Sequence, residues 1–262
     1  MKESYTQTEL HQVLSRVQKR SGWDFSRMND SRAPVPWDYR DVVLRYLTRQ
    51  ATVLDIGTDG GESFLKLAGF FGAGLGVDID PEMIERARAN GKDTANVDFA
   101  ISAETLDEVS ESFDVIVNRH APFDLTAIHH HLKPGGYYVT QQVAESIMLN
   151  IKEVLGQAGR SQITEELVNA SPLKLIAFMK YDVEYLVRDV DSLVFWLQAL
   201  DVLHSDLDGA ASLTHVDILN SILAYNVDER GFITNEARYL VIAQRRESGL
   251  ERTWSFGAGR SH

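Results

Sequence analysis

A glycine-rich turn holds the first residues whose types and spacing suit chemistry. Positions 53–62 read VLDIGTDGGE, a pattern typical of a buried strand that turns sharply into a helix. Such a turn brings backbone amides and a helix N-terminus close to a ligand. The spacing does not fit the dinucleotide pattern G-x-G-x-x-G, because Asp59 and Glu62 stand at its second and third positions counted from Gly57. A nicotinamide dehydrogenase is therefore disfavoured.

An acidic residue ends the next apolar run, about 20 residues downstream. Positions 76–83 read GVDIDPEM, and Asp78 directly follows the apolar residues. A carboxylate at the tip of the neighbouring strand is placed to accept hydrogen bonds from ribose hydroxyls. Asp80 and Pro81 are typical of the N-cap and first residue of the following helix.

Apolar runs that alternate with helical patterns must position these residues. The runs predict strands at 52–56, 74–78, 97–101, 113–118 and 136–142, with helices between them beginning near Gly60, Pro81, Glu104 and Asp124. Most of the runs are apolar enough for a parallel sheet covered by helices on both faces. The alternation implies right-handed crossovers and a doubly wound α/β sheet.

The flanking segments predict further elements. Helices are expected at 8–20, capped by Thr8, and at 38–48. After residue 143 the pattern predicts helices at 146–156, 163–168, 191–203 and 213–225, and strands at 175–187 and 237–245. We therefore expect an N-terminal helical lid at 1–50, a main domain at 51–247 with substrate-side insertions around 146–235, and a flexible tail at 248–262.

Three later segments complete a recognisable series of motifs: SAETL at 102–106, FDVIVNRH at 113–120 and LKPGGYYV at 132–139. In this order the motifs resemble those of class I (Rossmann-like) S-adenosylmethionine-dependent methyltransferases, over roughly 37–143 and more loosely to 245. The resemblance implies a doubly wound, mostly parallel seven-stranded sheet. It also implies S-adenosyl-L-methionine as cofactor and S-adenosyl-L-homocysteine as product.

The resemblance assigns roles to matching positions. The segment around the methionine part of the cofactor would comprise Asp55, Gly57, Thr58 and Gly61. Asp78 would hold the ribose, with Ile79 and Met83 flanking the adenine and Ala103 and Glu104 near its amino group. The methyl-transfer site would be lined by Asn118, Arg119 and His120, of which Asn118 and Arg119 would also bind the cofactor. The family usually has glycine where this chain has Asp59, but aspartate tolerates a left-handed backbone, so the turn can be kept.

Catalysis and acceptor binding have fewer candidates. His120 is the natural general base, because a histidine pKa lies near neutrality; the alternative is a histidine bonded for structure or to the cofactor. Methyl transfer also proceeds by holding donor and acceptor at near-attack distance, without a dedicated base. Candidate acceptor-binding residues are aromatic or lie at the rim: Trp23, Trp37, Tyr39 and Gln142, with its neighbour Gln141. The aromatic residues could instead pack the N-terminal helices onto the sheet.

A metal site is not expected. The chain has no cysteine, and consecutive helical residues such as His129, His130 and His131 point in directions about 100° apart, so they cannot chelate one ion from one face. The net charge of −12 and pI near 5.1 disfavour nucleic acid. The polar first residues and the lack of an apolar run of about 20 residues argue against a signal peptide or membrane span. A cytoplasmic protein is the simplest expectation, and the oligomeric state is open.

The leading hypothesis is methylation of an oxygen or nitrogen atom in a small molecule, natural product or short peptide. An RNA or protein methyltransferase is the second enzyme hypothesis. A cofactor-binding protein without catalysis, acting as a sensor or partner subunit, is the alternative from another class. The sequence does not identify the acceptor.

Overall fold

The structure, a computed structural model, describes residues 1–17, 25–200, 202–203, 213–224 and 226–246. In this part of the chain nine strands form one sheet, in the order β1-β7-β9-β6-β5-β2-β3-β4 with β8 paired to β9. Five parallel strands carry the predicted motifs: β2 (Thr52–Ile56), β3 (Ala73–Asp78), β4 (Val97–Ile101), β5 (Phe113–Arg119) and β6 (Leu132–Val143). Their carboxyl ends meet at one side of the sheet, which we call the carboxyl edge.

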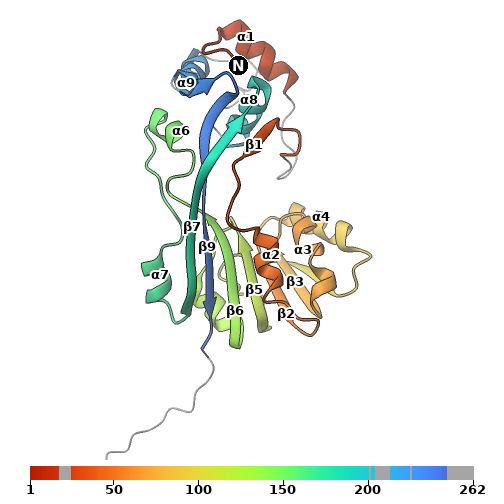
Figure 1. The fold of residues 1–262 in the computed structure, drawn as a ribbon. Coiled ribbons are helices and arrows are strands. Elements are labelled where there is room, and N and C mark those ends of the chain that lie inside the picture. Colours follow the sequence, from red (N-terminus) through yellow and green to blue (C-terminus); the bar gives the residue numbers. More distant parts are fainter. Residues whose placement is uncertain (18–24, 201, 204–212, 225, 247–262) are drawn as a thin grey trace, which may run out of the picture.

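Two strands of 14 residues each extend past the carboxyl edge: β7 (Lys174–Val187) and β9 (Gly231–Gln244). They pair antiparallel over their whole length, and β9 also pairs antiparallel with β6. Figure 1 shows their upper halves rising from the sheet to a separate group of helices. The short strands β1 (Asp30–Arg32) and β8 (Val227–Asp228) pair with these upper halves.

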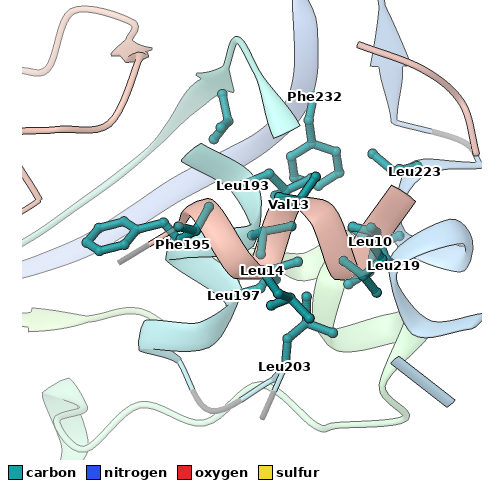
Figure 2. Close-up of a cluster of buried hydrophobic side chains, with 14 of the residues drawn as sticks. Leu10, Val13, Leu14, Leu193, Phe195, Leu197, Leu203, Leu219, Leu223 and Phe232 are labelled. Atoms are coloured by element: carbon teal, nitrogen blue, oxygen red, sulfur yellow. The ribbon is translucent and has the colours of Figure 1, made fainter. Parts of the chain in front are cut away.

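That group of helices forms a cap with its own core. It contains α1 (Gln7–Arg16), α6 (Leu149–Val154), α8 (Val190–Ala199) and α9 (Leu213–Leu223). The apolar side of α1 presents Val13 and Leu14 to Leu193 and Leu197 of α8, and Leu10 to Leu219 of α9, as Figure 2 shows. Since the cap stands above the carboxyl edge, acceptor-side groups can come from both the cap strands and the sheet.

Helices cover both faces of the lower sheet. One face packs against α2 (Tyr39–Leu44), α3 (Glu62–Leu65) and α4 (Pro81–Gly91), with a short 3-10 helix, η1 (Ala68–Phe70), beside α3. The other face packs against α5 (Leu125–His131) and α7 (Glu165–Ala170). This two-sided covering explains why the strands were apolar throughout.

The doubly wound α/β fold is confirmed, with four differences in detail. The sheet has nine strands in the described residues instead of seven, because β1 and β8 add short edges to the cap end. No helix begins near Glu104; turns replace it, and Leu106 there has φ +59°, outside the helical range. The first helix is capped by Thr6 instead of Thr8, in a reciprocal pair with Glu9. It ends at Arg16, before the predicted end near residue 20.

Residues 1–50 do not form one helical unit in the structure. Helix α1 belongs to the cap, whereas α2 packs against the lower sheet, and β1 lies between them in the chain. The predicted tail at 248–262 lies outside the described residues.

Candidate functional site

The ends of β2 and β3 are tied together by their loops. The backbone amides of Gly57 and Thr58 both donate to the carbonyl oxygen of Val77, at 2.9 Å. The amide of Asp59 donates to Oδ2 of Asp78 at 3.0 Å. The glycine turn and the acidic strand end thus form one local structure at the carboxyl edge.

The turn after β2 needs its unusual residues. Gly57 has φ +73°, and a Cβ there would lie 2.2 Å from Cβ of Ala121, closer than packed carbon atoms allow. Asp59, where the resembled family has glycine, has φ +52°, in the left-handed region that aspartate tolerates. Gly61, at φ +78°, precedes helix α3. The turn therefore keeps the close backbone approach expected of a cofactor loop.

Carboxylates gather around this turn. Burial, with the nearby charge of Asp78 adding to it, raises the pKa of Asp55 to about 7. Burial, followed by the charges of Glu62 and Asp78, also raises the pKa of Asp59. A cation bound beside these carboxyl groups would stabilise their ionised forms. We call Asp55, Asp59, Glu62 and Asp78 the acidic cluster.

Asp78 keeps capacity for a ligand. Its two carboxylate oxygens accept from the backbone amides of Asp59 and Asp80, each at 3.0 Å. A carboxylate has about four acceptor positions, so these two bonds leave others free for hydroxyl donors. The two amide bonds also fix the direction of the carboxylate.

An apolar platform adjoins Asp78. Ile79 is 68% exposed and Ile101, at the end of β4, is 47% exposed. Met83, which follows β3, and Ala103, which follows β4, are half-buried, and Glu104 is exposed. The protein's own packing does not account for the exposure of these two isoleucines. They leave an apolar surface beside the Asp78 carboxylate that is open to a ligand.

Asn118 has a structural position. It is fully buried, and its Nδ2 donates to the carbonyl oxygens of Ile56 at 3.1 Å and Pro122 at 3.3 Å. Its Oδ1 accepts from Thr140 Oγ1 at 3.1 Å and from the amide of Gln142. The side chain thus links the ends of β2, β5 and β6. Both of its polar atoms are already bonded within the protein, so neither is free for the predicted contact with a ligand.

His120 lies at the end of β5 in a left-handed conformation, with φ +61°. Trp37 Nε1 donates to Gln141 Oε1 at 3.0 Å, which leaves the Gln141 amide nitrogen to donate to His120 Nε2, at 3.4 Å. These two hydrogen bonds make His120 Nε2 an acceptor and so place the imidazole proton on Nδ1. Burial, followed by the positive charges of Arg238 and Arg119, keeps the pKa of His120 well below its usual value. The imidazole is therefore neutral at physiological pH.

The remaining predicted acceptor-site residues separate by position. Tyr39 lies beneath Arg119, whose guanidinium carbon is 5.6 Å from the ring centre, and its hydroxyl contacts the carbonyl oxygens of Asn118 and Val139. Trp37 packs on Tyr181, with ring centres 4.8 Å apart. Trp23 lies outside the described residues.

Gln141 and Gln142 are both buried, and they face opposite sides of the sheet. Neighbouring residues of a strand point to opposite faces of the sheet. Gln142 is 1% exposed and bonds Asn118, Thr140 and the carbonyl oxygen of Ala121. Gln141 lies on the other face, beside Trp37 and His120.

Sequence reasoning missed a group of charged residues from the cap strands. Arg238 and Glu236 of β9, Tyr181 of β7 and Arg32 of β1 lie on the same side of the sheet as Gln141. Alternation along a strand at 231–244 would have placed the two β9 residues on one face. The prediction began that strand at 237 and so left Glu236 out.

The described residues contain no group of three or more His, Asp or Glu side chains placed to hold a metal ion. His131 contacts the carbonyl oxygen of Glu111 at 2.9 Å, and Arg245 donates to backbone carbonyls of the same histidine run. No helix among the described residues is both long enough and apolar enough to cross a membrane.

Comparisons with known proteins agree with this geometry. Residues 53–136 match the family described as "Methyltransferase domain". The chain is 34% identical over 93 residues to ubiquinone biosynthesis O-methyltransferase of Sinorhizobium fredii, covering 32% of this chain and 38% of that protein. It is 37% identical over 98 residues to ribosomal protein L11 methyltransferase of Dechloromonas aromatica, covering 35% of this chain and 32% of that protein. The match thus spans about a third of each curated relative's length.

A solved structure shares the fold over a longer stretch. The crystal structure of a proposed methyltransferase from Bacillus halodurans C-125 superposes with a TM-score of 0.56 at 14% identity, covering 80% of this chain and 99% of that one. Residues 53–136, which match the family, contain the glycine turn, Asp78 and strand β5. Over residues 53–136 the chain thus matches a methyltransferase domain, and the whole sheet has the class I methyltransferase fold.

Proposed function

We propose that this protein transfers a methyl group from S-adenosyl-L-methionine to an oxygen or nitrogen atom of a small molecule, natural product or short peptide. The observation that carries the proposal is the joined pair of strand ends, where the glycine turn and Asp78 share a hydrogen bond beside exposed Ile79. These features offer a close backbone, a ribose acceptor and an apolar platform for one nucleoside.

The residues present would divide the binding of the cofactor. Gly57 and Gly61 would allow its methionine part to approach the backbone, and the acidic cluster would offset its positive charge. Asp78 would accept from the ribose, and Ile79 would lie against the adenine, with Met83, Ala103 and Glu104 around it. When bound, S-adenosyl-L-methionine supplies a methyl carbon made electrophilic by its sulfonium.

The protein's own contribution would be position and charge. An in-line displacement gains most of its rate from holding the acceptor at near-attack distance. Gln141 holds the His120 ring through Nε2, and Trp37 holds Gln141. A histidine with a low pKa is a weak general base, and its Nε2 already accepts from Gln141, so this ring is better suited to donate a hydrogen bond from Nδ1 to the acceptor group than to remove its proton. His120 would therefore orient the nucleophile.

A small acceptor is favoured by the distribution of positive charge. A protein that binds nucleic acid usually shows a basic stripe along one face. Here Arg119 and Arg238 lie near His120, and Arg32 lies near Arg238, in a chain of net charge −12. The matched relatives are named for a small-molecule pathway and for a ribosomal protein, so methylation of a protein remains the second candidate.

Calorimetry tests the cofactor assignment. We expect S-adenosyl-L-homocysteine to bind the full chain and NAD to give no heat of binding. Binding of NAD alone would contradict the proposal.

Labelling tests catalysis and the acceptor class. The chain and methyl-labelled S-adenosyl-L-methionine are incubated with a cell extract, and label is measured in the low-molecular-weight filtrate, the protein fraction and the RNA fraction. Label in the filtrate is expected. Label confined to protein or RNA would favour the second candidate, and cofactor binding with no transfer would favour a non-catalytic binding protein.

A further inference from the structure

Three arginines from three different strands lie on one face of the sheet, near the carboxyl edge. Arg119 pairs in register with Gln141, and Arg238 pairs with Val143 and Tyr181. Residues opposite one another in neighbouring strands share a face, and so do residues two apart in one strand. Arg119 and Arg238 therefore flank the Gln141–His120 pair. Arg32 of β1 joins them by its bond to Glu236, two residues before Arg238.

The charges in this group do not balance. Glu236 is the one carboxylate bonded to it among the described residues. It accepts from Arg32 at 2.7 Å and from the Tyr181 hydroxyl at 2.5 Å, and lies 3.6 Å from Arg238. Arg119 has no ion pair in the described part of the chain, and its recorded contact is the Tyr39 ring. Three guanidinium groups facing one carboxylate leave an excess of positive charge in an acidic protein.

Arg238 is both enclosed and under-bonded. Its side chain is 14% exposed, and its one hydrogen bond within the described residues runs from Nη1 to the carbonyl oxygen of Ala237, at 3.1 Å. The Nη2 contact with Glu236 is longer than a hydrogen bond, and Nε has none. Taking a guanidinium out of water is costly unless its donors are satisfied. The free Nε and Nη2 form the fork that binds a carboxylate with two parallel bonds.

The position of Arg238 points to the acceptor instead of the cofactor. It pairs with Val143, two residues beyond Gln141 on β6, which places it about 7 Å further toward the cap. The acidic cluster lies across β5, at the ends of β2 and β3. Trp37, packed on Tyr181, supplies an aromatic wall beside the same arginine.

We propose that the methyl acceptor carries a carboxylate group, bound by Arg238 and Arg119 with Trp37 and Tyr181 beside it. This inference rests on the proposed function, because it takes the neighbouring edge to be the cofactor site. The carboxylate anchors the acceptor on the cap side, and its nucleophilic atom then points toward His120 and the methyl group.

Benzoate serves as the probe, with benzamide as its neutral counterpart of the same shape. The full chain is saturated with S-adenosyl-L-homocysteine, and binding of each compound is followed by calorimetry and by the shift in Tm. Benzoate is expected to bind and to raise Tm, and benzamide is not. Arg238→Gln should weaken benzoate by about tenfold or more, with Arg238→Lys in between, because lysine keeps the charge and loses the fork. Equal binding of benzoate and benzamide would overturn the proposal.

Two further variants keep the test decisive. Arg119→Gln replaces an exposed residue, so it should fold and also weaken benzoate. Arg230→Gln is the matched control, because Arg230 lies in the turn between β8 and β9 and already has both Glu184 and Asp228 as partners. It should bind benzoate like the unaltered chain. Full benzoate affinity in both Arg119→Gln and Arg238→Gln would overturn the assignment.

Affinity for S-adenosyl-L-homocysteine separates the sources of the carboxylate. If Arg238→Gln loses affinity for S-adenosyl-L-homocysteine and keeps its affinity for benzoate, Arg238 binds the carboxylate of the cofactor itself and the inference fails. If the unaltered chain does not bind the nucleoside, the proposed function fails, and benzoate binding is then measured on the chain alone. Salt-dependent binding of a short RNA that is lost in Arg238→Gln, with no response to benzoate, would assign these arginines to phosphate instead.

Discussion

Two halves of the same sheet edge carry opposite charge. At the ends of β2 and β3, the acidic cluster surrounds a glycine turn, and burial and mutual repulsion raise the pKa values of Asp55 and Asp59. Across β5, burial, followed by the positive charges of Arg238 and Arg119, lowers the pKa of His120. The first half suits a cationic sulfonium nucleoside, and the second suits an anionic partner. Opposite charges at adjacent sites would orient both reactants without a catalytic base.

The halves also differ in how they are built. The acidic half is built at the ends of β2 and β3 and in the turn that follows β2, and the Asp78 carboxylate accepts from a backbone amide of each of the two loops. The basic half takes one residue each from β1, β5 and β9, which meet only when the sheet is assembled. A local site and an assembled site therefore lie next to one another, and they can be disabled separately.

The largest effect is expected at the acidic half. Asp78→Ala removes the ribose acceptor and should weaken S-adenosyl-L-homocysteine by about 100-fold, since each hydrogen bond to a charged group contributes about 1.5–3 kcal/mol. Calorimetry measures the affinity. Full affinity in this variant would remove the basis of the cofactor assignment.

The control for Asp78 must separate charge from site. Asp98 lies on β4 with an exposed side chain, so Asp98→Ala removes the same charge from the surface of the same region. It should leave the affinity unchanged. An equal loss in both variants would mean that net charge, and not the Asp78 position, governs binding.

The next effect is expected from the apolar platform. Ile79→Ser should weaken the nucleoside by about tenfold, because covering an isoleucine side chain contributes about 1.5–3 kcal/mol when burial is complete. Ile176→Ser is the matched control, at an isoleucine that is 43% exposed on β7. Equal affinities of the two variants would place the adenine elsewhere.

The acidic half could be predicted from sequence because its parts are local. The glycine turn, Asp78 and the capped helix after it are adjacent in the chain, and their strands were predicted within one residue at each end. Burial on both faces makes these strands apolar throughout, and that pattern is hard to confuse with a surface element.

Beyond Arg119 and His120, the basic half could not be predicted, because its geometry depends on long-range pairing. Arg32 reaches Glu236 across the sheet from an edge strand that only three residues form. Gln141 and Gln142 are equivalent by type, and which of them faces His120 depends on the strand register. The prediction chose Gln142, and the structure buries it among Asn118 and Thr140. The helix expected at Glu104 was lost to a turn that Leu106 completes with positive φ.

A smaller effect should appear as pH dependence in the acidic half. Asp55 has a pKa raised to about 7, so in the free protein it is partly protonated below that pH. A bound cation favours the ionised form, so binding releases a proton, and affinity should increase as pH rises from 6 to 8, by about fivefold. Asp55→Asn should show a weaker increase in calorimetry over the same range. Parallel pH profiles would mean that Asp55 does not face the cation.

The smallest effect tests the basic half through His120 itself. The positive charge of Arg238 contributes to the low pKa of His120, so Arg238→Gln should raise that pKa by about one unit, while Arg230→Gln should not change it. NMR of the imidazole nitrogens reports both the pKa and the proton on Nδ1. Benzoate should move the pKa in the same direction as the substitution, because a bound carboxylate neutralises the same guanidinium. If benzoate binds and the His120 pKa does not move, the two groups do not share a site, and the oppositely charged halves of the edge do not meet at the point of methyl transfer.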